Sequence, residues 1–265
     1  MQFYTQDRRW RWLALIAVAA NVAFNYLTQR LPFGEGTMEA ISARYDSLFT
    51  PAGYAFAIWG LIYAATLVYV IHQLLPSQRN ADAHDRLARP LIVLNLLGMA
   101  WITVFRFGLI SLSVFVIALM LVTSILLFVR ARDAAVRHEL SRWIVLPATL
   151  WFGWLSVAVI ANTSLWTVAM DWTDGIQLQW TLAMIAIATL LGLGVGYRYR
   201  SWVYPLVIAW AGVAIWVKHN EDFQAVALAA LASAAVMVGW AGFCAMRARR
   251  DRSGFRIFRG PMEMR

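Results

Sequence analysis

Charged side chains are scarce in this sequence. Asp, Glu, Lys and Arg make up 14% of the 265 residues, whereas a soluble domain is about one quarter charged and about half apolar. Hydrophobic residues reach 61%, which excludes both an ordinary soluble enzyme and a disordered chain. The apolar residues run for about 20 at a stretch instead of alternating as in a barrel strand. The sequence therefore predicts an all-α, polytopic helical membrane protein.

Cysteine and lysine are almost absent. The single cysteine, Cys244, excludes an internal disulfide, and no Cys/His pair has zinc-ligand spacing. The single lysine, Lys218, lies too near the end of an apolar run to predict a buried Schiff base. The four histidines also lie outside the centres of the runs, so a haem held by paired axial histidines is not predicted.

The apolar runs also lack acidic residues near their centres. Proton relays and ion pathways need ionisable groups at membrane depth, so these functions are not indicated. Arg106, at the outer end of the third run, is expected to extend to the membrane surface. No Walker loop, dinucleotide fingerprint or serine nucleophile elbow is present. We therefore predict no catalytic residue, no metal site and no required cofactor.

Eight apolar runs predict about eight transmembrane helices, at residues 12–29, 53–75, 90–107, 111–130, 143–163, 178–197, 201–217 and 223–246. With a cytoplasmic N-terminus, 19 of the 23 Lys and Arg residues lie on the cytoplasmic side. This asymmetry predicts that both termini are cytoplasmic. The net charge of +9 is then a topology signal, which argues against nucleic-acid binding.

Aromatic and amide residues recur on shared helix faces. Within the second run Phe56, Trp59 and Tyr63 are spaced three and four residues apart. Similar faces are formed by Asn21 with Asn25 in the first run, by Gly98, Trp101 and Phe105 in the third, and by Trp151, Trp154, Ala158 and Asn162 in the fifth. Such residues suit a pocket for a flat, apolar ligand. Helix packing with asparagine as an interhelical hydrogen-bonding group explains the same spacing.

Sequence motifs favour the ligand pocket over helix packing alone. The stretch from Pro51 to Tyr63, PAGYAFAIWGLIY, resembles the second-helix signature of the TspO/translocator-protein family of tryptophan-rich sensory proteins. Trp154, Ala158 and Asn162 match the fifth-helix pattern of that family, and Trp101 and Phe105 match its third helix. The sequence departs from the signature where Tyr54 replaces a Trp, Ala52 replaces a Pro and Gly98 stands at an expected Asn.

The resemblance covers about residues 12–165 and implies a five-helix bundle, often dimeric, with its pocket beneath the first loop. It implies a ligand such as a porphyrin or haem, bound within the bilayer of a bacterial inner membrane. The expected ligand-binding residues are Phe56, Trp59, Tyr63, Trp101, Phe105, Trp154, Ala158 and Asn162, with Tyr54 at the mouth of the pocket. The loop of residues 31–50, which contains Arg44 and Asp46, is the expected lid.

Three regions follow from these observations. Residues 1–165 are expected to form a TspO-like five-helix bundle, residues 166–247 three additional transmembrane helices, and residues 248–265 a basic cytoplasmic tail. The favoured function is sensing or binding of a hydrophobic small molecule, with the lipid bilayer, that ligand and a second copy of the chain as partners. The alternatives are a transporter of a hydrophobic molecule, with Gly192, Gly194 and Gly196 allowing a helix to bend, and a regulatory or assembly subunit.

Overall fold

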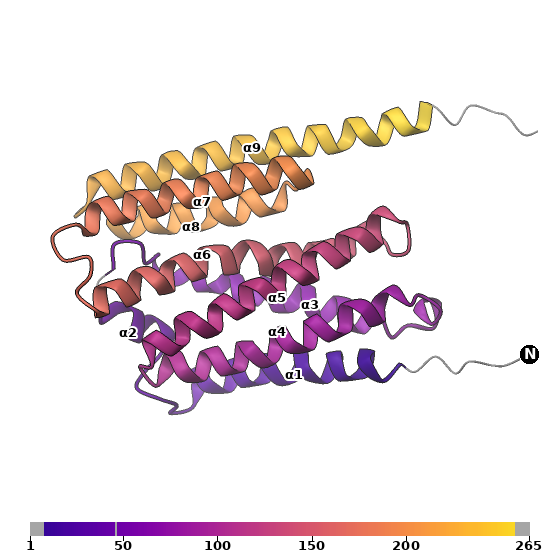
Figure 1. Ribbon diagram of the computed structural model, residues 1–265, viewed down its shortest axis with the longest axis horizontal. Helices are drawn as coiled ribbons and strands as arrows, with labels where there is room; N and C mark the ends of the chain where they lie inside the picture. Colours follow the sequence, from indigo (N-terminus) through magenta and orange to yellow (C-terminus); the bar gives the residue numbers. More distant parts are fainter. Residues whose placement is uncertain (1–7, 46, 258–265) are drawn as a thin grey trace, which may run out of the picture.

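A computed structural model describes residues 8–45 and 47–257, and the regular elements of these residues are helices (Figure 1). Seven helices are long and apolar enough to cross a membrane, and one shorter apolar helix joins them. This arrangement confirms the predicted polytopic helical fold. Together with the shorter α8, these are called the long helices below: α1 (Arg9–Arg30), α3 (Ile58–His72), α4 (Ala83–Arg106), α5 (Ile110–Val136), α6 (Val145–Ala169), α7 (Gln177–Tyr199), α8 (Val203–His219) and α9 (Gln224–Ile257).

Short elements fill the connections between the long helices. The first connection is the longest and contains α2 (Met38–Ala43) and the 3-10 turn η1 (Gly53–Ala57), which leads directly into α3. Two further 3-10 turns, η2 (Pro76–Gln78) and η3 (Arg142–Ile144), lie at the opposite end of the bundle. Figure 1 shows α1 beginning and α9 ending at that same end.

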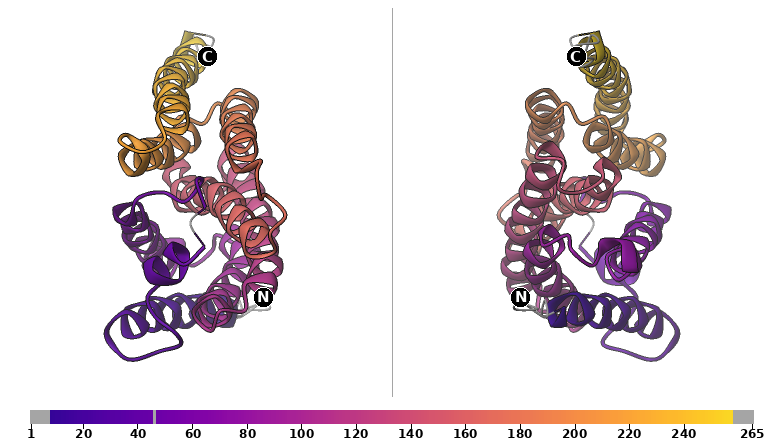
Figure 2. Two further views of the ribbon diagram at one scale, coloured as in Figure 1. Left: turned by 90° about the vertical axis from the view of Figure 1, so that its left-hand side faces the viewer. Right: turned by 90° about the vertical axis from the view of Figure 1, so that its right-hand side faces the viewer.

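The first five long helices form a closed ring of neighbours. In order around the ring, α1 contacts α4, α4 contacts α5, α5 contacts α6, α6 contacts α3, and α3 contacts α1. Helices α7, α8 and α9 contact one another, and α7 and α8 pack on α6 from outside the ring (Figures 1 and 2). Helix α6 is therefore covered on most sides, and 72% of an 18-residue apolar stretch within residues 142–169 is buried.

Several helices extend beyond the predicted apolar runs at their arginine-rich ends. Helix α4 begins at Ala83, so Pro90, expected at its start, lies inside the helix. Proline leaves the carbonyl four residues earlier without its helical donor, and Arg130 Nη1 donates to that Arg86 carbonyl over 3.0 Å. Helix α9 continues to Ile257, so the expected tail of residues 248–265 starts as helix; residues 258–265 lie outside the described part of the chain.

Arg106 does not reach the membrane surface as expected. Its side chain is only 3% exposed. The Arg106 Nε donates to the Gly36 carbonyl over 2.6 Å, Nη1 donates to the Thr28 carbonyl, and the guanidinium lies 5.5 Å from the centre of the Phe33 ring. The buried guanidinium is retained because carbonyl oxygens of the first loop accept its protons. Arg106 therefore fastens that loop to the outer end of the bundle.

Candidate functional site

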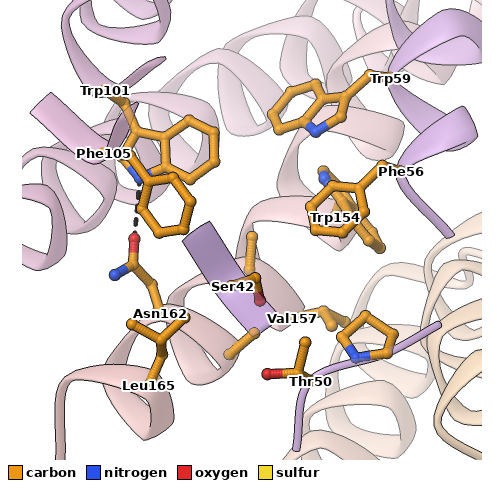
Figure 3. Close-up of a pocket in the computed structure, with 13 residues that line it drawn as sticks. Ser42, Thr50, Phe56, Trp59, Trp101, Phe105, Trp154, Val157, Asn162 and Leu165 are labelled. Carbon is orange, nitrogen blue, oxygen red and sulfur yellow. Dashed lines mark hydrogen bonds between the residues drawn. The ribbon is translucent and has the colours of Figure 1, made fainter. Parts of the chain in front are cut away.

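A small cavity of about 40 Å³ lies inside the five-helix ring, beneath the first loop (Figure 3). Its walls come from α3, α4 and α6, and its roof comes from α2 and the segment that leads into η1. The lining residues are mostly apolar. They are Ser42, Thr50, Pro51, Phe56, Trp59, Trp101, Phe105, Trp154, Val157, Ala158, Ala161, Asn162 and Leu165.

Aromatic rings form most of the wall. The ring centres of Trp59 and Trp154 are 6.2 Å apart, with their planes nearly perpendicular at 87°. Phe56 lies edge-on to Trp154 at 6.4 Å, and on the opposite wall Trp101 stacks on Phe105 at 5.1 Å. Edge-to-face and offset arrangements at these distances are favourable for aromatic rings. The wall thus offers flat stacking surfaces from three different helices.

Asn162 is held by two hydrogen bonds on one side of the cavity. Trp101 Nε1 donates to Asn162 Oδ1 over 2.9 Å, and Asn162 Nδ2 donates to Ser113 Oγ over 2.9 Å. The bond between Trp101 and Asn162 is visible in Figure 3. Because both ends of the amide have partners, Asn162 fixes the positions of α4, α5 and α6 relative to one another. Its side chain is therefore an ordered part of the wall.

Three other polar atoms at the cavity have no protein partner. The buried Nε1 atoms of Trp59 and Trp154 and the hydroxyl of Thr50 make no hydrogen bond within the described structure. In Figure 3 both indole nitrogens face the space between the two rings. A buried donor without a partner costs about 1–3 kcal/mol. A ligand that carries an acceptor oxygen or nitrogen would recover part of that free energy.

Two of the predicted site residues do not line this cavity. Tyr54, expected at the mouth, is 42% exposed, and its ring packs against Trp210 of α8 with the ring centres 5.4 Å apart. Tyr63 lies deeper on α3, where it stacks on Trp59 at 5.7 Å and its hydroxyl accepts a hydrogen bond from Asn25 Nδ2. Trp151 is fully buried and donates through Nε1 to Thr66 Oγ1. The other predicted residues, Phe56, Trp59, Trp101, Phe105, Trp154, Ala158 and Asn162, lie together in the wall.

The roof comes from the loop that was expected as the lid and from the residue that follows it. Its lining residues are Ser42 of α2, Thr50 and Pro51, which the sequence analysis did not single out. Ala161 and Leu165 also line it, and their spacing from Ala158 on α6 could have identified them. Within the expected lid, Arg44 forms an ion pair with Glu35 at the surface, whereas Asp46 lies outside the described residues.

The last three helices support the roof from the side. The backbone amide of Ala52 donates to the Ala214 carbonyl of α8 over 3.0 Å. Trp210 Nε1, also on α8, donates to the Ala55 carbonyl over 3.0 Å. These bonds fix the segment between the roof and α3 to α8. The position of the cavity roof therefore depends on a helix outside the five-helix ring.

The polar residues offer no evident metal site among the described residues. No group of three or more His, Cys, Asp or Glu side chains is arranged to hold an ion there. His72 lies with its ring 4.9 Å from Trp143 and 6.1 Å from His84. His84 Nε2 is hydrogen bonded to Gln78 and Nδ1 to Tyr69. These histidines belong to a packed polar cluster at the η2 end of the bundle.

The size of the cavity limits what it holds in this conformation. Sites for small-molecule ligands usually occupy about 300–1,000 Å³, and a cavity of about 40 Å³ is far smaller. A porphyrin would enter only if the roof moved or the rings of Phe56 and Trp154 changed rotamer. In this conformation the cavity therefore has too little room for a ligand of that size.

Comparison with known proteins gave one match. A family model described as TSPO-like protein matches residues 11–243, which includes α7, α8 and most of α9 as well as the five-helix ring. No curated protein and no solved structure matches the chain. The family pattern therefore extends beyond residues 12–165, to which the motifs alone had pointed.

Proposed function

Because the chain belongs to the TSPO-like protein family, we propose that it binds a flat hydrophobic ligand, such as a tetrapyrrole, in the cavity beneath the first loop. The observation that carries this proposal is the pair of buried indole N–H groups of Trp59 and Trp154, which have no partner within the described structure. They belong to aromatic rings in the wall of the same cavity that the unpaired hydroxyl of Thr50 lines. The favoured ligand is therefore aromatic and carries an acceptor oxygen or nitrogen at one edge.

Ligand entry requires the closed site to open. The roof is the moving part because it consists of α2 and loop segments, whereas the walls are long packed helices. A required rearrangement slows association relative to a preformed site. The ligand would then convert a closed receptor into an open one, which suits sensing or storage of a hydrophobic molecule.

The biological setting is also part of the proposal. The placement of 19 of 23 cationic residues on one side supports an orientation with both termini in the cytoplasm, in a bacterial inner membrane. A homodimer is expected from the family resemblance. Transport is the alternative, and the glycines suggested for helix bending have another role. Cβ atoms at Gly192 and Gly196 would meet Met237 and Trp240 of α9, so both glycines permit close helix packing.

Titration of the detergent-purified protein with protoporphyrin IX and with haem tests the proposal. We expect saturable, stoichiometric binding with a Kd in the micromolar range or below. The shift of the porphyrin absorption band measures this binding. Trp154→Phe removes one indole donor but keeps an aromatic ring, and should weaken binding about tenfold, as expected for one hydrogen bond. Ala158→Phe fills the cavity and should weaken it further.

Matched controls separate the site from general effects. Trp172→Phe changes an indole that is 62% exposed and remote from the cavity lining. Ala100→Phe adds the same ring to an exposed position on α4. Both should bind porphyrin as the unaltered protein does. Equal affinities in all four variants would overturn the assignment of the site, and absence of saturable binding would overturn tetrapyrroles as its ligands.

A further inference from the structure

A second cavity, of about 500 Å³, lies at the end of the bundle where α5 and α7 end and α6 and α8 begin (Figure 1). It brings together three arginines that are distant in sequence. Arg132 comes from α5, Arg142 from η3, and Arg200 from the residue that ends α7 in a left-handed conformation with φ 52°. We call this the basic cavity.

The charged side chains that line the basic cavity are arginines. Neither Arg132 nor Arg142 forms a salt bridge within the residues that the structure describes. The cationic neighbours of Arg132 are Arg198 and Arg200, and its acidic neighbour is Asp133. The Arg132 guanidinium lies over the Tyr199 ring at 4.8 Å. Like charges gathered in this way attract an anion.

An apolar groove of about 450 Å³ continues from the basic cavity. The two share Leu146, Trp202 and Val203 in their linings, so they lie next to each other. From there the groove runs along α8, past Leu206 to Trp210, between α8 and the residues Ile58 and Leu61 of α3. Leu61, Trp202, Leu206 and Trp210 are all exposed, and in a bilayer they would face lipid.

We propose that the basic cavity and the groove together bind one anionic phospholipid. The phosphate is held by Arg132, Arg142 and Arg200, because guanidinium groups bind phosphate oxygens with paired hydrogen bonds. One acyl chain follows the groove from Trp202 toward Trp210. A free phosphate would use the arginines but leave the groove empty, which is why a lipid is the favoured occupant. Basic pockets between membrane helices on the cytoplasmic side commonly bind such headgroups.

The lipid would have a structural consequence. Its acyl chain would fill the space where α8 meets α3 and α6, and so would tie the last three helices to the five-helix ring. This site is separate from the cavity beneath the first loop, and the proposal does not depend on the ligand of that cavity. It rests on the arrangement of charges and apolar residues alone.

Native mass spectrometry of the delipidated full-length protein tests the proposal. We expect one tightly retained molecule of dioleoylphosphatidylglycerol, and at least tenfold weaker binding of dioleoylphosphatidylcholine. The double variant Arg132→Gln with Arg142→Gln should bind phosphatidylglycerol at least tenfold more weakly. Arg132→Lys with Arg142→Lys keeps the charge but loses the paired hydrogen bonds, so its affinity should lie between those of the unaltered protein and the glutamine variant. It also provides a folded comparison if the glutamine variant is unstable.

The control variant carries Arg79→Gln and Arg137→Gln. It loses the same charge at the same end of the bundle, from exposed residues outside the basic cavity, and should bind phosphatidylglycerol within twofold of the unaltered protein. Equal binding of both lipids, or equal losses in the two glutamine variants, would overturn the site. Glycerol phosphate that displaces the lipid at equal concentration would show a phosphate site instead and overturn the role of the groove.

Discussion

Two arginines that look like surface charges in the sequence are buried in the structure. Arg106 holds the first loop at the outer end, and Arg11, which has a side chain with 0% exposure, joins α1 to α4 at the other end. Arg11 makes two hydrogen bonds to Asp85, at 3.0 and 2.8 Å, and further ones to carbonyls of the segment after α3. Arginine therefore has two roles in this protein. Its distribution indicates the topology, and the buried Arg11 and Arg106 hold separate segments of the fold together.

Replacing Arg106 should loosen the roof of the ligand cavity. Arg106→Met keeps the length of the side chain but removes the charged donors to the carbonyls of Thr28 and Gly36, each such bond contributing about 1.5–3 kcal/mol. We expect amide hydrogen exchange across residues 33–44 to become at least tenfold faster. Porphyrin association should also accelerate, because opening would cost less.

Arg44→Met is the control for this loop. Arg44 and Glu35 form an ion pair that is about half exposed on both sides, and such pairs contribute at most about 1 kcal/mol. Exchange across the loop should therefore change by only a few-fold. Unchanged exchange in Arg106→Met would show that the loop is held by other contacts.

At the scale of the elements, glycines set how closely the helices approach. A Cβ atom on Gly212 of α8 would lie 2.9 Å from the carbonyl oxygen of Ala230 in α9, a backbone atom that cannot move aside without moving the helix. On α4, Gly98 leaves room for Asn21, whose side chain donates to Asn95 across the α1–α4 contact over 3.0 Å. The motif that this chain resembles has an asparagine at the position of Gly98. In this chain Asn95, one turn earlier, supplies an amide at the α1–α4 contact.

Gly212→Ala and Gly194→Ala should have opposite effects on thermal stability in detergent. The first pushes α8 from α9, and overpacking costs about 1–3 kcal/mol. The second adds a methyl group where no atom lies within 4 Å, and alanine is favoured over glycine inside a helix by about 0.5–1 kcal/mol. We expect a lower melting temperature for Gly212→Ala and an equal or higher one for Gly194→Ala. Equal lowering in both would contradict this account of the α8–α9 contact.

Because the number of long helices in the described part of the chain is even, α1 begins and α9 ends at the same end of the molecule (Figure 1). The charge asymmetry predicts that this end is cytoplasmic. The single cysteine, Cys244, is buried and can be replaced by serine to give a background without thiols. Asn80 and Asp174 are exposed at opposite ends of the bundle and are suitable positions for reporter cysteines.

Labelling with a membrane-impermeant maleimide measures this orientation. In intact spheroplasts, the variant with Asp174→Cys should label and the variant with Asn80→Cys should not, whereas both should label after lysis. The opposite labelling pattern would show that the protein has the inverse orientation, with the basic cavity away from the cytoplasmic leaflet.

Patterns in the sequence were sufficient to predict about eight apolar helices in their order, the family resemblance and seven aromatic, small or amide residues of the cavity wall. These are local properties, since an apolar run of sufficient length must be helical in lipid and residues three or four apart share a helix face. Helix packing, by contrast, brings Tyr54 against Trp210, places Thr50 and Ser42 of the expected lid in the cavity lining, and leaves the cavity small. It also brought Arg132, Arg142 and Arg200 together beside an apolar groove. Such contacts depend on how separate helices pack against each other. Helix α6 is apolar on nearly all sides, so its hydrophobicity does not specify which helices cover each face.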